Sequence, residues 1–135
     1  MARFVMSLDE AVNLIINSTK IMKGEEIFIL RSMNCIKIYD LASALVNYYD
    51  KINNHKSSIK IINKLSSEKL NEELFLIEEI PYIKIYKDIF VINRQKNYNL
   101  NKKEIKNLEK FRVSNFNFMS EKDIIKYLKK IEILH

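Results

Sequence analysis

Glycine and proline are almost missing from this sequence, which has one of each, Gly24 and Pro81, in 135 residues. Loops that hold phosphates, such as GxGxxG and the P-loop, need several glycines close together because the backbone must approach the ligand closely. Neither loop can be written with one glycine. We therefore expect no cofactor site in this chain, and no dinucleotide bound by it alone.

Cysteine and histidine are equally scarce. Cys35 is the only cysteine, so no disulfide can form within the chain, and a reducing compartment is the default. The histidines His55 and His135 are far apart and do not have the spacing of zinc ligands. They also form no convincing Ser-His or Cys-His pair for nucleophilic catalysis. We predict a buried structural thiol at Cys35, no metal site and no catalytic residue.

Long hydrophobic runs are absent as well. No apolar stretch approaches the roughly 18–20 residues of a membrane span, and the N-terminus lacks the charged-then-apolar pattern of a signal peptide. We expect a soluble, cytoplasmic protein with no membrane partner.

The net charge of +6 comes from 23 basic and 17 acidic residues, and 19 of the basic residues are lysines scattered among acids. Nucleic-acid recognition favours clustered arginine, so a nucleic acid is the least favoured partner. The hydrophobic share of 47% suffices for a core, and the length predicts a single domain over 1–135.

Short polar side chains precede several segments with apolar residues at helical spacing, and each predicts a helix start. Ser7 with Glu10, three residues later, has the pattern of a capping box. The predicted helices are Leu8 to about Met22 with Gly24 after it, a helix capped by Asp40, Glu68 to about Phe75 capped by Ser67, a weak helix at Lys103–Lys110, and Glu121 to about Ile133 capped by Ser120.

Apolar and β-branched runs between these helices predict short strands. Alternating residues on either side of Lys87-Asp88 indicate a hairpin, although this pair is a poorer turn than Asn-Gly. The predicted strands are Glu26–Leu30, Ile36–Ile38, Ser58–Asn63, Tyr82–Tyr86 and Ile89–Asn93. The fold class is therefore α/β, as a small mixed α/β domain.

Four segments, in their order and spacing, resemble the C-terminal part of CapD-like polysaccharide-biosynthesis proteins. Members of that family typically read TRFxMSLDEAVDLV, GGEIFV, DLA, and RPGEKLHEEL or RHGEKLYE. The resemblance is strongest over 3–74 and weaker over 75–135. The matching segments here are RFVMSLDEAV at 3–12, GEEIF at 24–28, DLA at 40–42 and EKLNEEL at 68–74.

These family members are extended short-chain dehydrogenase/reductases that act on UDP-N-acetylglucosamine as 4,6-dehydratases or epimerases. The resemblance implies a Rossmann half before the Arg-Phe motif, carrying the glycine-rich NAD loop and a Tyr-Lys catalytic pair. Met1 stands where that half would end. We therefore expect a chain that is inactive alone and acts with a separate Rossmann-domain partner, which would supply the NAD site.

By the same resemblance, Arg3 matches an arginine near the phosphate or ribose of the nucleotide. A guanidinium forms paired charge-assisted hydrogen bonds to phosphate oxygens, which suits that role. The equally weighted alternative is an arginine that bonds nearby carbonyls or an acid.

The family's second phosphate-binding arginine falls on Leu65 in this sequence, next to Lys64. Ser66 and Ser67 stand in place of Pro-Gly or His-Gly. The Glu68-Lys69 pair of the motif is retained, and the first turn of a helix would equally explain Glu68. The candidate residues for a UDP phosphate are Arg3, Lys64, Glu68 and Lys69.

Three functions remain open. The first is the UDP-sugar-binding portion of a split dehydratase or epimerase, and the second is a remnant or interaction module that has lost its ligand. The third is a small basic nucleic-acid-binding protein. The first two imply apolar surface once covered by a Rossmann half, so we expect an exposed apolar patch or a homo-oligomer.

Overall fold

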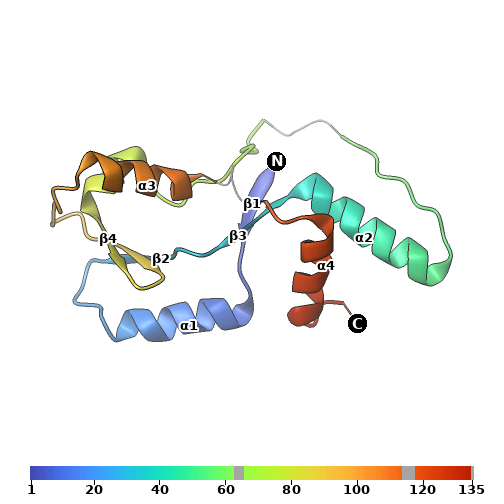
Figure 1. Ribbon diagram of the computed structural model, residues 1–135, viewed down its shortest axis with the longest axis horizontal. Helices are drawn as coiled ribbons and strands as arrows, with labels where there is room; N and C mark the ends of the chain where they lie inside the picture. The colour runs from blue at the N-terminus through green and yellow to red at the C-terminus, as the bar shows by residue number, and fades with distance from the viewer. Residues whose placement is uncertain (63–65, 114–117, 135) are drawn as a thin grey trace.

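The chain opens with strand β1, Ala2–Val5, which leads directly into helix α1, Leu8–Thr19. The structure, a computed structural model, describes residues 1–62, 66–113 and 118–134 (Figure 1). The Ser7 hydroxyl accepts the Glu10 amide at 3.2 Å, and the Glu10 carboxylate accepts the Ser7 amide at 2.6 Å. The predicted capping box is confirmed. The helix ends before the expected Met22, and Gly24 lies in the loop that follows.

Two small antiparallel sheets follow from the short apolar runs. β1 pairs with β3, Asn34–Lys37, so that Arg3 lies opposite Ile36. The second sheet has the order β2-β5-β4, and its hairpin turns at Lys87, where φ is +51°. The hairpin around Lys87-Asp88 is therefore confirmed. The strands of this sheet are β2, Ile27–Leu30, β4, Ile83–Tyr86, and β5, Ile89–Ile92.

Two of the remaining helices begin after a residue whose polar side chain caps them, and α2 follows directly after a strand. Ser120 caps α4 by accepting the Asp123 amide, as predicted. Asn101 caps α3 and forms a capping box with Glu104, so the helix there is better defined at its start than the weak helix predicted at Lys103–Lys110. The elements are α2, Ile38–Asn53, the 3-10 helix η1, Ile77–Tyr82, α3, Lys102–Arg112, and α4, Glu121–Lys130.

The buried side chains form two clusters on either side of the β1–β3 pair (Figure 1). One cluster lies among η1, the β4–β5 hairpin and α3, around the fully buried Phe90. The other lies among β3, α2 and α4, around the fully buried Ile124. The fold is a mixed α/β arrangement, as predicted, while the single-domain assignment stays a prediction.

The predicted strand at Ser58–Asn63 is wrong over its described part. Residues 55–62 form no strand, and Ile61 and Ile62 are 78% and 79% exposed. β-branched residues favour a strand only where a neighbouring strand and a buried face receive them. Among the described residues no strand pairs with Ile61 or Ile62, and Asn63 lies outside the described residues.

The predicted helix at Glu68–Phe75 is also wrong. The Ala2 amide donates to the Leu70 carbonyl at 2.8 Å, and the Leu74 amide donates to the Arg112 carbonyl at 2.8 Å. Glu73 forms an isolated bridge with Val113. Pairing with distant backbone groups therefore replaces the local helical pattern, as tertiary context can.

Asp40 is not a helix cap, which corrects that prediction. β3 continues directly into α2, so the cap position falls on Lys37, whose side chain makes no capping bond. Asp40 lies in the first turn, where a carboxylate interacts favourably with the positive end of the helix dipole.

Ser18 is the buried polar residue at the inner face of α1, and its hydroxyl has no hydrogen-bond partner among the described residues. Because an unsatisfied buried hydroxyl destabilises the fold, we expect Ser18→Ala to raise the free energy of unfolding by about 1 kcal/mol. Urea denaturation would measure this. Asn17→Ala, at an exposed neighbouring position, controls for helix propensity, and an equal gain there would contradict the expectation.

Glu79 stabilises the turn before β4 through two contacts. Its carboxylate accepts Arg94 Nη2 at 2.6 Å and the Leu76 amide at 2.8 Å, and the Arg94 bond is the main reason that its pKa lies below the ordinary 4.5. A lowered pKa in the folded state adds stability above the unfolded pKa, and this stability is lost as the pH falls through the folded value.

We expect Glu79→Gln to cost about 1 kcal/mol of stability at pH 7, a modest value because solvent screens the exposed Arg94. The difference from the unmutated chain should shrink once the pH falls well below 4.5. Unfolding measured from pH 7 to pH 3 checks this, with the exposed neighbour Glu78→Gln as control. A difference that stays constant with pH would contradict the assignment.

Candidate functional site

Arg3, on β1, is the centre of the site predicted from sequence. Its Nη1 donates to the carbonyls of Ala2 at 2.8 Å and Lys69 at 3.0 Å, and its Nε lies 3.2 Å from the Glu72 carboxylate. The side chain is 28% exposed. The alternative in which Arg3 bonds carbonyls and an acid is thus the arrangement in this structure.

Backbone pairing places Arg3 beside the 69–72 segment. The Ala2 amide bonds to Leu70, so the residues after Glu68 run along the start of β1. The structure therefore brings Arg3 and Lys69 together although they are far apart in sequence. Lys64, the remaining predicted basic residue, lies outside the described residues, as does Leu65.

The charges around Arg3 are nearly balanced. Lys69 is 65% exposed and lies 4.0 Å from Glu73, which also pairs with Arg112. An incoming phosphate would meet the guanidinium of Arg3 and the ammonium of Lys69, and it would compete with Glu72 and Glu73 for them. The cluster can thus hold an anion only by exchanging these carboxylates for the ligand.

The described part of the chain shows no reactive thiol and no set of metal ligands at this cluster. Cys35 is 1% exposed, and burial raises the pKa of its thiol, which agrees with a structural role. Within residues 1–62, 66–113 and 118–134, no three His, Cys, Asp or Glu side chains are arranged to hold a metal ion.

Gly24 offers no cradle for a dinucleotide. Its φ is +120°, and no atom lies within 4 Å of the place that a β-carbon would occupy, so it serves a turn rather than a close backbone approach. Gly24 therefore does not have the surroundings of a glycine in a phosphate-binding loop of a dinucleotide site.

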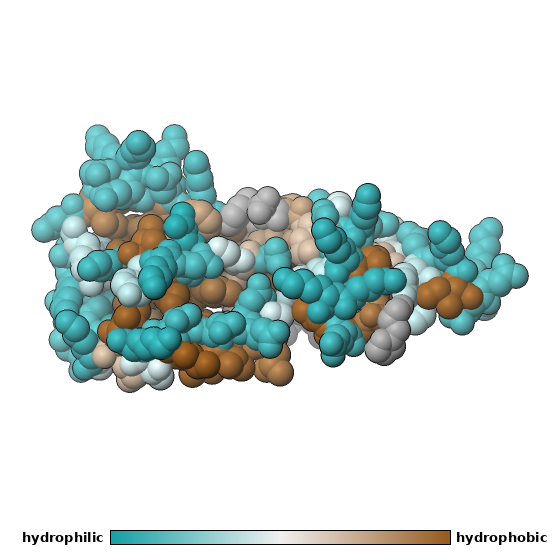
Figure 2. All heavy atoms as spheres, turned by 60° about the horizontal axis from the view of Figure 1, so that its bottom comes forward, coloured by the Kyte–Doolittle hydropathy of each residue, from teal (hydrophilic) through white to brown (hydrophobic). Residues whose placement is uncertain are grey.

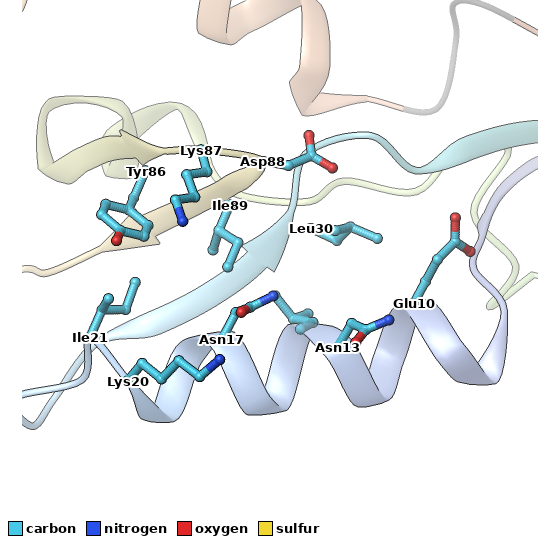
Figure 3. Close-up of a pocket in the computed structure, with 11 residues that line it drawn as sticks. Glu10, Asn13, Asn17, Lys20, Ile21, Leu30, Tyr86, Lys87, Asp88 and Ile89 are labelled. Carbon is cyan, nitrogen blue, oxygen red and sulfur yellow. The ribbon is translucent and has the colours of Figure 1, made fainter.

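A cleft of about 390 Å³ between α1 and the β4–β5 hairpin was not predicted from the sequence (Figure 3). Asn13, Asn17 and Lys20 line its α1 side, and Lys87 reaches in from the hairpin turn. The spacing of Asn13, Asn17 and Lys20 could have predicted a polar helix side here, because residues at i, i+4 and i+7 share one face of a helix. Leu14, Ile21, Leu30 and Ile89 supply apolar lining.

The two carboxylates of the cleft are already engaged. Glu10 completes the cap of α1, and Asp88 accepts a hydrogen bond from the Ser32 hydroxyl. Lys20 and Lys87 form no ion pair within the described parts of the chain. The cleft has the polar groups and volume of a small-molecule site and contains no activated nucleophile.

Comparison with known proteins gives a consistent result. Residues 1–94 match the family model described as polysaccharide biosynthesis protein. The chain is 36% identical to an uncharacterized membrane protein of Methanocaldococcus jannaschii, over 99% of this chain and 40% of that protein. It is similar to the X-ray structure of Pen from Bacillus thuringiensis, with a TM-score of 0.79 and 28% identity over 100% of this chain and 40% of Pen.

The chain therefore spans about 40% of the length of each of these relatives. One relative is named a membrane protein, and in the described part of this chain no helix has both the length and the apolar character needed to cross a bilayer.

Proposed function

The chain belongs to the polysaccharide biosynthesis protein family, and from this premise we propose that it is the nucleotide-sugar-binding portion of a dehydratase or epimerase of the UDP-N-acetylglucosamine type. The portion is not catalytic by itself. It works in the cytoplasm with a Rossmann-type body that supplies the nicotinamide cofactor. The task of this chain's own residues is to bind and orient the diphosphate.

The observation that carries the proposal is the placement of Arg3. The fold brings its guanidinium to the segment that resembles the family's Glu-Lys motif, with the Lys69 carbonyl 3.0 Å away. A diphosphate at this position would replace Glu72 on Arg3, and it would draw the exposed Lys69 ammonium away from Glu73. Lys64 and Glu68 complete the set of residues that we assign to the phosphate region.

In the proposed function, the cofactor and this chain have separate roles. Oxidation and reduction at the sugar belong to the nicotinamide, while the protein positions the sugar against it. In this proposal the chain contributes the substrate side only. Its charge-assisted bonds to phosphate would fix the nucleotide end, which determines where the sugar ring lies.

The second candidate is a module that keeps the fold and has lost the ligand. Two observations favour it: Glu72 already pairs with Arg3, and leucine occupies position 65, where the family has its second arginine. In this case the Arg3–Glu72 pair is structural. The two candidates differ in what removal of the Glu72 charge does.

Calorimetric titration with UDP and UDP-N-acetylglucosamine separates the candidates. We expect Arg3→Ala to weaken binding by about tenfold or more, because a charge-assisted hydrogen bond to a charged group contributes roughly 1.5–3 kcal/mol. Glu72→Gln should strengthen binding several-fold, because the competing carboxylate is gone. Arg94→Ala, which breaks the arginine–glutamate pair with Glu79, should leave binding unchanged.

The titrations are made on the chain alone and on its complex with a Rossmann-type partner, and circular dichroism verifies that each variant is folded. Absence of UDP-sugar binding in both samples would contradict the proposal and favour the module without ligand. A steep salt dependence of binding to DNA or RNA would instead revive the nucleic-acid hypothesis.

A further inference from the structure

The cleft between α1 and the β4–β5 hairpin has no role in the proposed function (Figure 3). None of the residues that line it belongs to the cluster formed by Arg3, Lys69, Glu72 and Glu73. Its volume of about 390 Å³ lies within the range of small-molecule pockets, near the lower end. The side chains of its rim and floor therefore indicate what kind of small molecule fits.

The rim of the cleft carries two ammonium groups without a carboxylate partner. Lys20 lies on the α1 wall, and Lys87 reaches in from the hairpin turn on the opposite wall (Figure 3). Neither lysine forms an ion pair with another described residue. The two carboxylates of the lining are instead engaged by Ser7 and Ser32. A cleft with positive charge on both walls attracts an anion.

The backbone at Lys87 supports a role for this side chain. Lys87 occupies the first central position of the hairpin turn, and its φ of +51° lies in the left-handed region that favours glycine or asparagine. Residues held in such conformations gather where a ligand is bound. The Lys87 ammonium also lies 5.7 Å from the centre of the Tyr86 ring, and Tyr86 itself lines the cleft.

Two side-chain amides extend the polar wall on α1. Asn13 and Asn17 precede Lys20 by seven and three residues, so all three lie on one side of the helix. Both asparagines are exposed, and each amide can donate two hydrogen bonds. The α1 wall thus offers neutral donors next to a positive charge, a combination that suits the oxygens of a phosphate group.

The floor of the cleft is apolar. Ile89 is buried, and Leu14, Ile21 and Leu30 are half-buried. An apolar group that reaches this floor leaves water, which favours binding of an organic molecule over a simple ion. A ligand that fits both parts of the cleft has an anionic end at the rim and an apolar body below it.

A phosphate monoester is the anion that matches the rim best. It carries about 1.5 to 2 negative charges at pH 7 and three acceptor oxygens, whereas a carboxylate has a single charge. We infer that the cleft is a second binding site, for a small organic phosphate monoester whose phosphate lies between Lys20 and Lys87. This inference is independent of nucleotide-sugar binding, because Arg3 is not part of the cleft.

Phenyl phosphate is the probe, because it joins a phosphate to a compact apolar ring. Inorganic phosphate and phenol supply the two halves separately. Titration of the isotope-labelled chain, followed through its backbone amide signals in NMR spectra, measures the affinity and the location together. We expect saturable shifts at residues 13–21 and 86–89 with phenyl phosphate, and at least about tenfold weaker binding of either half.

Lys20→Gln and Lys87→Gln should each weaken phenyl phosphate binding by at least about fivefold, because each removes one of the two ammonium groups. Lys84→Gln is the matched control. It removes the same charge from an exposed residue of the same hairpin, outside the lining of the cleft, and should change the affinity by less than about twofold. Circular dichroism verifies that each variant is folded.

The outward side of α1 is the surface from which the cleft must be distinguished. Figure 2 shows hydrophobic surface along the lower edge of the lobe that contains α1, and the exposed apolar residues of this helix are Leu8, Val12, Ile15 and Ile16. Adsorption of the ring to this side would shift their amides with phenol as strongly as with phenyl phosphate. That result, with Lys20→Gln having no effect, would overturn the inference.

Arg3→Ala separates this inference from the proposed function. We expect this change to leave phenyl phosphate binding unaltered. If Arg3→Ala abolished binding while Lys20→Gln and Lys87→Gln did not, the probe would lie at the phosphate region of the proposed function and the inference would be wrong. Inorganic phosphate that binds as tightly as phenyl phosphate, or no saturable binding of phenyl phosphate, would contradict it as well.

Discussion

The pairing of β1 with β3 is the constraint on which the rest of the structure depends. Each strand leads within a few residues into a helix, β1 into α1 and β3 into α2, so a single register sets the direction of both. The Cys35 carbonyl of β3 also accepts the Met119 amide at 3.0 Å, which brings the start of α4 to α2. The two buried clusters are thereby held on opposite sides of one short ladder.

The pairing of β1 with β3 also determines the position of Arg3 in the candidate site. This pairing places Arg3 next to residues 69–72. Its guanidinium therefore already contacts Glu72 and two backbone carbonyls in the structure. A phosphate must then gain more from Arg3 than the carboxylate it displaces. In the structure, Arg3 is therefore engaged by Glu72 and by the carbonyls of Ala2 and Lys69.

Helix α1 turns an apolar side outward, where Leu8, Val12, Ile15 and Ile16 are exposed. Its inner side carries the buried Ser18 and the half-buried Ala11 and Leu14. Helix α1 thus has an outward apolar side and a polar side that lines the cleft.

The sequence by itself determined the elements whose causes are local: the capping box of α1, the Ser120 cap of α4 and the β4–β5 hairpin all follow from residues within a few positions of each other. It also indicated the family and the candidate residue Arg3. Only the tertiary structure decided that residues 68–75 bond to Ala2 and Arg112 instead of forming a helix, and that Glu72 reaches Arg3. It also decided that the apolar side of α1, with Leu8, Val12, Ile15 and Ile16, is exposed. These depend on contacts between distant segments, and local propensity contains no information about which distant backbone or charge will be within reach.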